Sequence, residues 1–272
     1  MKYLIISFIG AGNMATSLIK GLLKKNYPAK NIWAANKNVE QLDKLKNLNI
    51  NLTTDNRLAV EKADIVVLAV KPQKLKIVTK GITDQIQEKK PLIISLAVGI
   101  NLKTLAVYLS SQSLAIIRSM PNTPALIGCG ATGLFANQNC ISSQKSAAEN
   151  LFQSVGITIW LTTEEQIDVV AALSGSGPAY FFLFMEALED AAIKLGLSKQ
   201  NANILTLQTA LGSAQMAVKG EKSLAELRQQ VTSPGGTTEQ ALKFLKTSRF
   251  PDIIKQALKE AKCRAEELNK EF

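Results

Sequence analysis

A glycine-rich turn near the N-terminus constrains the fold of this chain more than any other feature. The pattern Gly10-x-Gly12-x-x-Ala15 directly follows the apolar run "YLIISFI" and opens a helical pattern. In this context the first glycine permits a tight turn, the second lets a pyrophosphate approach the backbone, and the alanine allows close helix packing. The turn therefore predicts dinucleotide binding at a helix N-terminus. The alternative is a purely structural turn in another doubly wound protein.

The next segments alternate between strand and helix patterns. Apolar runs typical of buried strands occur at 31–36, 65–70, 91–97 and 114–120, and helical patterns at 12–25, 39–47, 73–88 and 101–110. Residues 131–162 add two strand patterns and a helix that can complete the sheet. Continuous apolar strands between amphipathic helices indicate a parallel sheet that is covered on both faces.

After residue 162 the pattern becomes helical throughout. Helices are predicted at 164–173, 178–195, 199–219, 221–230, 237–247 and 251–270. The predicted fold is therefore α/β, with a Rossmann-type doubly wound parallel sheet in residues 1–162 and an all-helical domain in residues 163–272. The helix that starts at Pro178 is apolar around most of its circumference. It is expected either at the centre of its domain or in contact with a second copy of the chain.

Composition excludes several classes of function. The 272 residues include no histidine and three widely spaced cysteines, so the commonest general base is missing and no metal is expected. Almost all of the net charge of +10 arises in residues 1–90, which carry 16 basic and 7 acidic side chains without a basic run. This distribution favours a small polyanionic ligand over nucleic acid. The most apolar stretch, "GPAYFFLFMEAL", is interrupted by Glu186, so we expect no membrane span. The odd number and wide spacing of the cysteines fit a reducing cytoplasm.

The end of the second strand indicates which dinucleotide is bound. NAD-binding loops usually place an acid there to hold the ribose 2′-hydroxyl, whereas this chain has Asn36, Lys37 and Asn38. Because a lysine can neutralise a 2′-phosphate, NADPH is favoured, with NADH as the alternative. Lys37 could equally be a solvated surface charge. Lys71, after the third strand, is either a polyanion contact or a charge that caps a helix.

A second glycine-rich turn, "SPGGTTEQAL", lies in the helical half. Gly235 and Gly236 are predicted to expose successive backbone N–H groups at a helix start, where the helix dipole favours an anion. A well-capped helix without a ligand is the alternative. Together with the similar segment "SGSGPAY", this turn predicts a small anionic substrate.

Five segments, taken together, resemble the pyrroline-5-carboxylate reductase family over essentially the whole chain. They are "FIGAGNMA", "DIVVLAVKPQ", "RSMPNTPALIGCGATGL", "EEQIDVVAALSGSGPAY" and "VTSPGGTTEQAL". The resemblance implies reduction of 1-pyrroline-5-carboxylate to L-proline with NADPH or NADH, the last step of proline biosynthesis. It also implies a homodimer that is interlocked through the helical domains and assembled into larger rings.

The resemblance assigns roles to individual residues. With the second-strand end included, the predicted cofactor residues are Gly10, Ala11, Gly12, Asn13, Met14, Asn36, Lys37, Asn56, Ala69, Val70, Lys71, Pro72 and Ala97. The predicted substrate residues are Ser233, Gly236, Thr237, Thr238, Glu164 and Glu221. The hydroxyl of Thr238 is expected to meet the ring nitrogen and to act in orientation and proton relay, which makes it the predicted catalytic residue. The two glutamates can also be interpreted as ordinary exposed residues at helix ends.

Two other functions are compatible with the dinucleotide turn. A hydroxyacid dehydrogenase of similar organisation would need a lysine and an asparagine on the interdomain helix, and residues 178–193 contain neither. A redox-sensing NADP-binding protein would keep the first turn but would have no use for the second. Reduction of a C=N bond fits the missing histidine, because the imine can be protonated by solvent before it binds.

Overall fold

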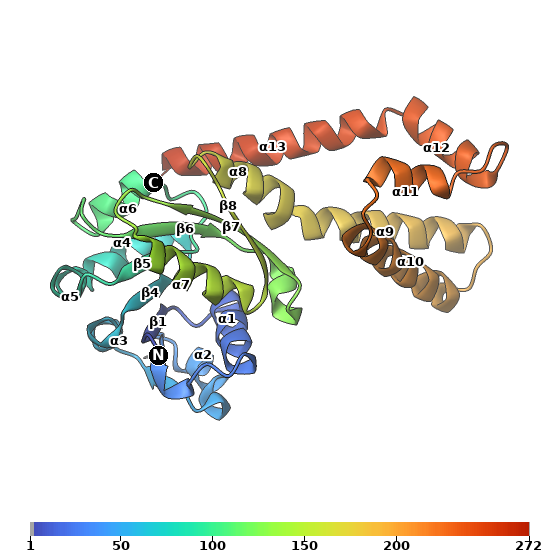
Figure 1. Cartoon of the computed structure of the whole chain (residues 1–272). Helices are drawn as coiled ribbons and strands as arrows, with labels where there is room; N and C mark the ends of the chain where they lie inside the picture. Colours follow the sequence, from blue (N-terminus) through green and yellow to red (C-terminus); the bar gives the residue numbers. More distant parts are fainter. Residues whose placement is uncertain (1–2, 272) are drawn as a thin grey trace. The chain divides into compact units, whose positions relative to one another are not determined.

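The computed structural model describes residues 3–271 and contains one eight-stranded sheet (Figure 1). The strands are β1 (Ile6–Ile9), β2 (Ile32–Ala35), β3 (Asn51–Thr53), β4 (Ile65–Leu68), β5 (Leu92–Ser95), β6 (Ile116–Met120), β7 (Gly130–Ala136) and β8 (Gly156–Trp160). Their order across the sheet is β3-β2-β1-β4-β5-β6-β7-β8. The chain reverses its winding direction between β1 and β4, which is where open α/β sheets bind ligands.

The sheet is parallel except between β6 and β7, which pair antiparallel. The sequence predicted a parallel sheet, so this pair is a correction. Its physical cause is the short connection between the two strands, which holds only a 3₁₀ turn (Thr123–Ile127) and leaves no room for a crossover helix. The short, half-buried strand β3 was also missed, because its sequence "NLT" has no apolar run.

Alternating strand residues build a hydrophobic core on each face of the sheet. Phe8 and Val67 point into one core, and their neighbours Ile9 and Val66 point into the other. The first core is covered by α1 (Asn13–Lys24), α2 (Val39–Asp43) and α7 (Ser142–Gln153). The second core is covered by α3 (Asn56–Lys62), α4 (Pro72–Lys80), α5 (Thr83–Lys89) and α6 (Leu102–Tyr108). This is the doubly wound arrangement that the sequence predicted.

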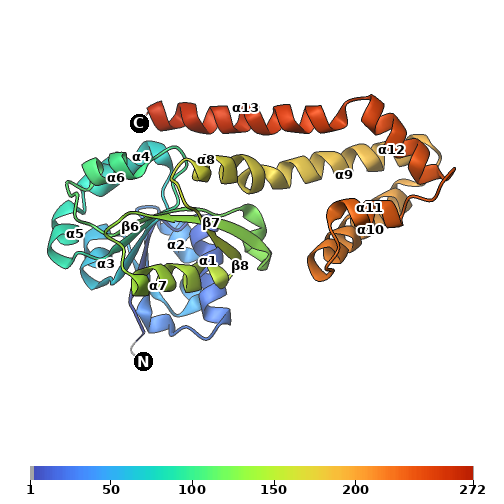
Figure 2. The ribbon, with the colours of Figure 1, turned by 45° about the horizontal axis from the view of Figure 1, so that its top comes forward.

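The remaining helices form the second half of the chain. They are α8 (Gln166–Val170), a π-helical turn (Ala171–Gly175), α9 (Gly177–Lys194), α10 (Lys199–Lys219), α11 (Leu224–Gln230), α12 (Thr237–Thr247) and α13 (Phe250–Glu271). α9 and α10 pack side by side (Figure 2). The helices α9, α10, α12 and α13 begin and end within one residue of the predicted bounds.

The chain divides into two compact units, residues 1–176 with 261–272 and residues 177–260. The change from strands to helices near residue 162 therefore precedes the division between the units. The last helix, α13, starts in the second unit and ends in the first. The functional domain limits of 1–162 and 163–272 stay a prediction.

The second unit buries few of its apolar side chains. Phe181, Phe182 and Leu183 on α9 are 71%, 64% and 66% exposed, and α12 contains no buried residue. By length and composition alone, the helical stretch Gln166–Lys194 could cross a membrane. Only 28% of its most apolar 18-residue segment is buried. A large exposed apolar surface of this kind marks an interaction site.

Candidate cofactor and substrate sites

The first glycine turn lies between β1 and α1, at the point where the sheet reverses its winding. Gly10 has φ = 104°, and a Cβ there would come within 2.5 Å of the Ala69 carbonyl oxygen, so this position requires glycine. A Cβ at Gly12 would meet no atom within 4 Å. Gly12 therefore leaves open space at the N-terminus of α1, whose first turn contains no acidic side chain. This space suits a pyrophosphate, as the sequence predicted.

Polar side chains follow β2, at the edge of the sheet where a cofactor ribose would lie. The Asn36 Oδ1 atom accepts a hydrogen bond from the Asn38 amide at 3.0 Å, and the Asn38 Oδ1 atom caps α2 through the Glu40 amide at 2.9 Å. Lys37 is exposed, and among residues 3–271 it has no ion-pair partner. The two asparagines thus shape the turn and leave the lysine available to a phosphate group.

The segments after β4 and β5 form the rest of this edge. Ala69 is tied to β1 by its amide, which donates to the Ile9 carbonyl oxygen at 2.9 Å. Lys71 is exposed at the N-cap of α4 and its side chain makes no capping hydrogen bond, while Pro72 starts the helix. Ala97 is 7% exposed and its amide donates to the Ser95 hydroxyl at 3.2 Å.

The remaining predicted cofactor residues also lie at this edge. Val70 follows Ala69, and Asn56 is the first residue of α3. Ala11, Asn13 and Met14 belong to the glycine turn and the start of α1. The structure brings the predicted cofactor residues together after the carboxyl ends of β1, β2, β3, β4 and β5 in one unit.

The second glycine turn precedes α12 in the other unit. Its two glycine amides are hydrogen-bonded, whereas the sequence predicted that they are exposed. The Gly235 amide donates to the Glu239 carboxylate at 2.8 Å, and the Gly236 amide donates to the Ser233 carbonyl oxygen at 3.0 Å. Both glycine amides are therefore engaged, one by the first turn of α12 and one by the loop itself. The reason is the left-handed conformation of Gly235, with φ = 72°, which turns the chain back on itself.

The free backbone amides at this turn belong to the residues that directly follow the two glycines. Thr237 and Thr238 begin α12, and among the described residues their amides have no hydrogen-bond acceptor. The N-cap Gly236 makes no side-chain capping bond that could take their place. Two unpaired amides at the start of an eleven-residue helix favour an anion, and these are the amides that the family resemblance assigned to the substrate.

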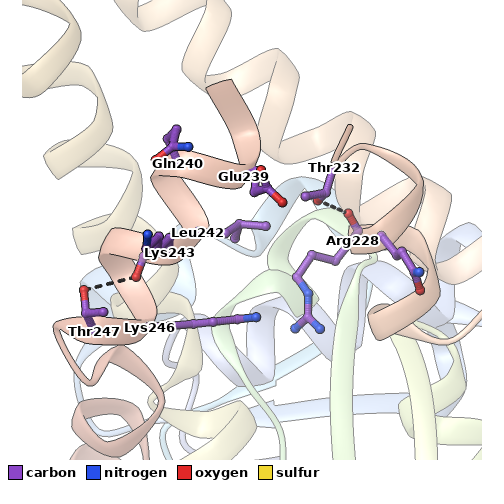
Figure 3. Close-up of a pocket in the computed structure, with 9 residues that line it drawn as sticks. Arg228, Thr232, Glu239, Gln240, Leu242, Lys243, Lys246 and Thr247 are labelled. Carbon is purple, nitrogen blue, oxygen red and sulfur yellow. Dashed lines mark hydrogen bonds between the residues drawn. The ribbon is translucent and has the colours of Figure 1, made fainter. Parts of the chain in front are cut away.

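A pocket of about 590 Å³ lies between α11 and α12 (Figure 3). The side chains of Arg228 and Lys246 extend toward one another in this pocket, and Glu239 lines it from the first turn of α12. Its lining does not include Ser233 or the two threonines at the start of α12. The pocket is therefore separate from the free amides.

The two glutamates predicted to lie near the substrate have different surroundings. Glu221 is exposed in the turn before α11. The Glu164 Oε1 atom accepts a hydrogen bond from the Leu102 amide at 2.7 Å and forms an ion pair with the Arg118 Nη1 atom at 2.7 Å. Because Arg118 is 3% exposed, Glu164 compensates a buried charge and fixes the start of α6.

A buried polar network was missed by the sequence analysis. Asp168 on α8 is 6% exposed, and its Oδ2 atom accepts a hydrogen bond from the side-chain Nδ2 atom of Asn269 at 2.9 Å. Burial raises the pKa of the Asp168 carboxyl, while the bond from Asn269 and the charge of Arg118 oppose this shift. No local pattern could reveal the network, since Asp168 and Asn269 lie 101 residues apart in the sequence.

Asn122 is a further missed residue, although it belongs to a segment that carried the family resemblance. It is 9% exposed, and its side chain accepts from the Ala131 amide at 2.9 Å and donates to the Ser174 carbonyl oxygen at 3.0 Å. It thereby links β7 to the π-helical turn before α9. These two bonds require a donor and an acceptor on one short side chain, which the amide of Asn122 supplies.

The fold and the open glycine turn define a dinucleotide-dependent oxidoreductase, and comparison with known proteins specifies it. A family model described as pyrroline-5-carboxylate reductase dimerisation matches residues 164–268, and one described as NADP oxidoreductase, coenzyme F420-dependent, matches residues 5–99. The chain is 48% identical to a pyrroline-5-carboxylate reductase of Pseudomonas aeruginosa, over 97% of this chain and 96% of the relative. It belongs to the pyrroline-5-carboxylate reductase family.

Two solved structures are similar over nearly the whole chain. A pyrroline-5-carboxylate reductase from Coxiella burnetii is 46% identical with a TM-score of 0.94, covering 98% of this chain and 99% of that one. A pyrroline carboxylate reductase from Plasmodium falciparum, solved with NADP bound, is 31% identical with a TM-score of 0.87, covering 99% of both chains. The family resemblance that the sequence motifs indicated is confirmed.

Proposed function

We infer that this chain reduces 1-pyrroline-5-carboxylate to L-proline with NADPH, the last step of proline biosynthesis. Family membership over the whole length supports this function. The observation that carries it is that one chain contains both an open glycine turn at the switch point of its sheet and a helix start with two unpaired amides. The first suits a dinucleotide and the second a carboxylate.

The cofactor residues at the sheet edge bind and orient NADPH, which when bound supplies the hydride for C5 of the ring. The turn from Gly10 to Met14 receives the pyrophosphate at the start of α1. Lys37 neutralises the 2′-phosphate, which favours NADPH while leaving NADH as a second cofactor. The remaining predicted cofactor residues, Asn56, Ala69, Val70, Lys71, Pro72 and Ala97, border the ribose and the nicotinamide.

The substrate carboxylate binds to the free amides of Thr237 and Thr238, with the Ser233 hydroxyl as a third donor. The Thr238 hydroxyl meets the ring nitrogen, orients the ring and relays a proton. A strong protein acid is not required, because the imine is protonated by solvent before it binds. This accounts for a reductase without histidine. Gly236 keeps the loop compact, and Glu221 adds an acidic side chain near the substrate.

Glu164 is assigned an indirect part in this site. Its carboxylate is already engaged by Arg118 and by the start of α6, so it acts on the substrate region through the backbone that it holds.

The exposed apolar surface of α9 is proposed to bind a second copy of the chain. The description of the matched family as a dimerisation family supports this role, as do the exposed aromatic side chains of the helix. We further propose that residues 163–272 act as a substrate-binding and dimerisation domain and that dimers assemble into larger rings. The enzyme is proposed to act in the cytoplasm without a membrane or nucleic-acid partner.

The proposed activity is tested by following NADPH absorbance with three additions in parallel. Pyrroline-5-carboxylate should cause oxidation of NADPH, and proline should be the product. A 3-hydroxy acid with NADP⁺ should give no reduction, and neither should the protein with cofactor alone. Turnover of the hydroxy acid would favour the dehydrogenase instead, and binding of NADPH without any turnover would favour a redox sensor.

A further inference from the structure

The last turns of α13 belong to the first unit, although the helix starts in the second. Ala265 is the buried residue of this helix, at 5% exposure. The following turn contains Leu268 and Asn269, whose contacts lie at residues distant in the sequence. This end of the chain carries none of the predicted cofactor or substrate residues, so its contacts need another explanation.

Leu268 lies against the loop that follows β5. A Cβ at Gly99 would come within 2.7 Å of the Leu268 Cβ atom and within 3.1 Å of its carbonyl carbon. Gly99 has φ = 73°, so the loop combines a left-handed turn with a very close approach to the helix backbone. Ala97, a proposed cofactor residue, lies two positions earlier in the same loop. The helix therefore limits where this cofactor segment can move.

Asn269 fixes the same helix end to α8 through its hydrogen bond to Asp168. The charges of Arg118 on β6 and of Lys262 and Glu266 on α13 act on the Asp168 carboxyl. Arg118 in turn forms the ion pair with Glu164, which holds the Leu102 amide at the start of α6. The loop is thus held on both sides, by Leu268 at Gly99 and by Glu164 where the loop enters α6.

We propose that Leu268 and Asn269 are positioning residues for the cofactor: they hold residues 96–100 in the conformation that borders the nicotinamide. Leu268 covers the turn at Gly99, and Asn269 anchors the helix so that Leu268 stays in place. Neither side chain is proposed to touch the cofactor or the substrate. The proposal rests on the proposed reductase function, because it assigns a role to the cofactor loop in that reaction.

The test compares Leu268→Gly, which removes the Cβ atom that faces Gly99, and Asn269→Ala with Lys270→Gly at an exposed position in the same turn. The first two variants should raise both the dissociation constant and the KM for NADPH by roughly tenfold, since a displaced loop misplaces the cofactor. The KM for pyrroline-5-carboxylate should change by less than about twofold. Lys270→Gly, which carries the same cost of a glycine in the helix, should resemble the wild type in all three constants.

A conservative variant separates positioning from a general loss of stability. Leu268→Ala should keep the Cβ atom that faces Gly99 and therefore keep NADPH affinity near the wild-type value. Thermal unfolding of every variant identifies any that fail to fold, and the fluorescence titration with NADPH is then interpreted on the folded ones. Unchanged NADPH affinity in folded Leu268→Gly, or equal loss in Lys270→Gly, would overturn the proposal. An inactive wild type that still binds NADPH would instead reject the reductase function.

Discussion

The two glycine turns of this chain are similar in sequence but differ in how the protein supports them. The turn at residues 10–15 is packed into the sheet, with Ala11 and Ala15 each 1% exposed. The turn at residues 233–238 opens a helix that buries none of its residues, and its glycine amides are engaged by Glu239 of that helix and by the Ser233 carbonyl oxygen. The first turn is fixed by a hydrophobic core. The second is fixed by local hydrogen bonds, and its free donors are the backbone amides of Thr237 and Thr238.

This contrast extends to the units that carry the turns. The first unit has a core on each face of its sheet, whereas the second exposes large apolar side chains on α9, α10 and α12. A unit that leaves so much apolar surface in water is stabilised by association. The cofactor turn is therefore supported by the core of its own unit, whereas we expect the unit that carries the second turn to be supported by association with another copy.

The largest effect is expected from a substitution that disrupts the packing of the first turn. Gly10→Ala should lower the free energy of unfolding by about 3 kcal/mol, because it adds backbone strain and a clash with Ala69. Gly12→Ala should leave that free energy nearly unchanged and lower NADPH affinity, because its Cβ enters open space where the pyrophosphate would lie. Urea unfolding and an NADPH titration measure the two quantities. Equal destabilisation by both substitutions would contradict the different roles of the two glycines.

A second substitution tests whether the helical unit needs a partner. Phe182→Glu, on α9, should weaken dimerisation roughly 100-fold, since buried aromatic residues are often the strongest contacts of an interface. Val107→Glu on α6 is the matched control, because Val107 is 61% exposed and Phe182 is 64% exposed. Sedimentation velocity over a range of concentrations measures the effect. Dissociation by both variants to the same extent would mean that the apolar surface of α9 is not the interface.

A third substitution tests the substrate turn itself. Thr238→Ala should lower kcat roughly 30-fold through loss of the hydroxyl that orients the ring, while NADPH affinity stays at the wild-type level. Thr238→Ser should retain most of the activity, because it keeps the hydroxyl. Steady-state kinetics with pyrroline-5-carboxylate as the varied substrate measure both variants. Unchanged turnover in Thr238→Ala would remove this residue from the mechanism.

The smallest expected effect concerns the charge after β2. Lys37→Ala should raise the KM for NADPH roughly fivefold, about 1 kcal/mol, because an exposed charge interacts weakly with a phosphate. The KM for NADH should not change, since NADH has no 2′-phosphate. The ratio of the two KM values, measured at low and high salt, isolates the contribution of Lys37. A parallel rise for both cofactors would show that the lysine acts on a part that they share.

Much of the fold could be predicted from short patterns. The apolar runs and the glycine turn specify a parallel sheet with a dinucleotide site, because strand and helix periodicities are local properties. The reversal of β7 could not be predicted in this way, since it depends on the connection from β6 being too short for a helix. The engaged amides of Gly235 and Gly236 were missed for a similar reason, because hydrogen bonds depend on dihedral angles that the residue types do not specify.

The sequence by itself determined the fold class, the cofactor turn and the family, through residues that are close together along the chain. Only the tertiary structure decided that Glu164 pairs with buried Arg118, that Asp168 meets Asn269, and that Leu268 covers Gly99. These contacts join segments separated by up to 169 positions in the numbering, between Gly99 and Leu268. Such pairs arise when helices and strands pack, and packing depends on the shapes of many side chains together instead of on any local pattern.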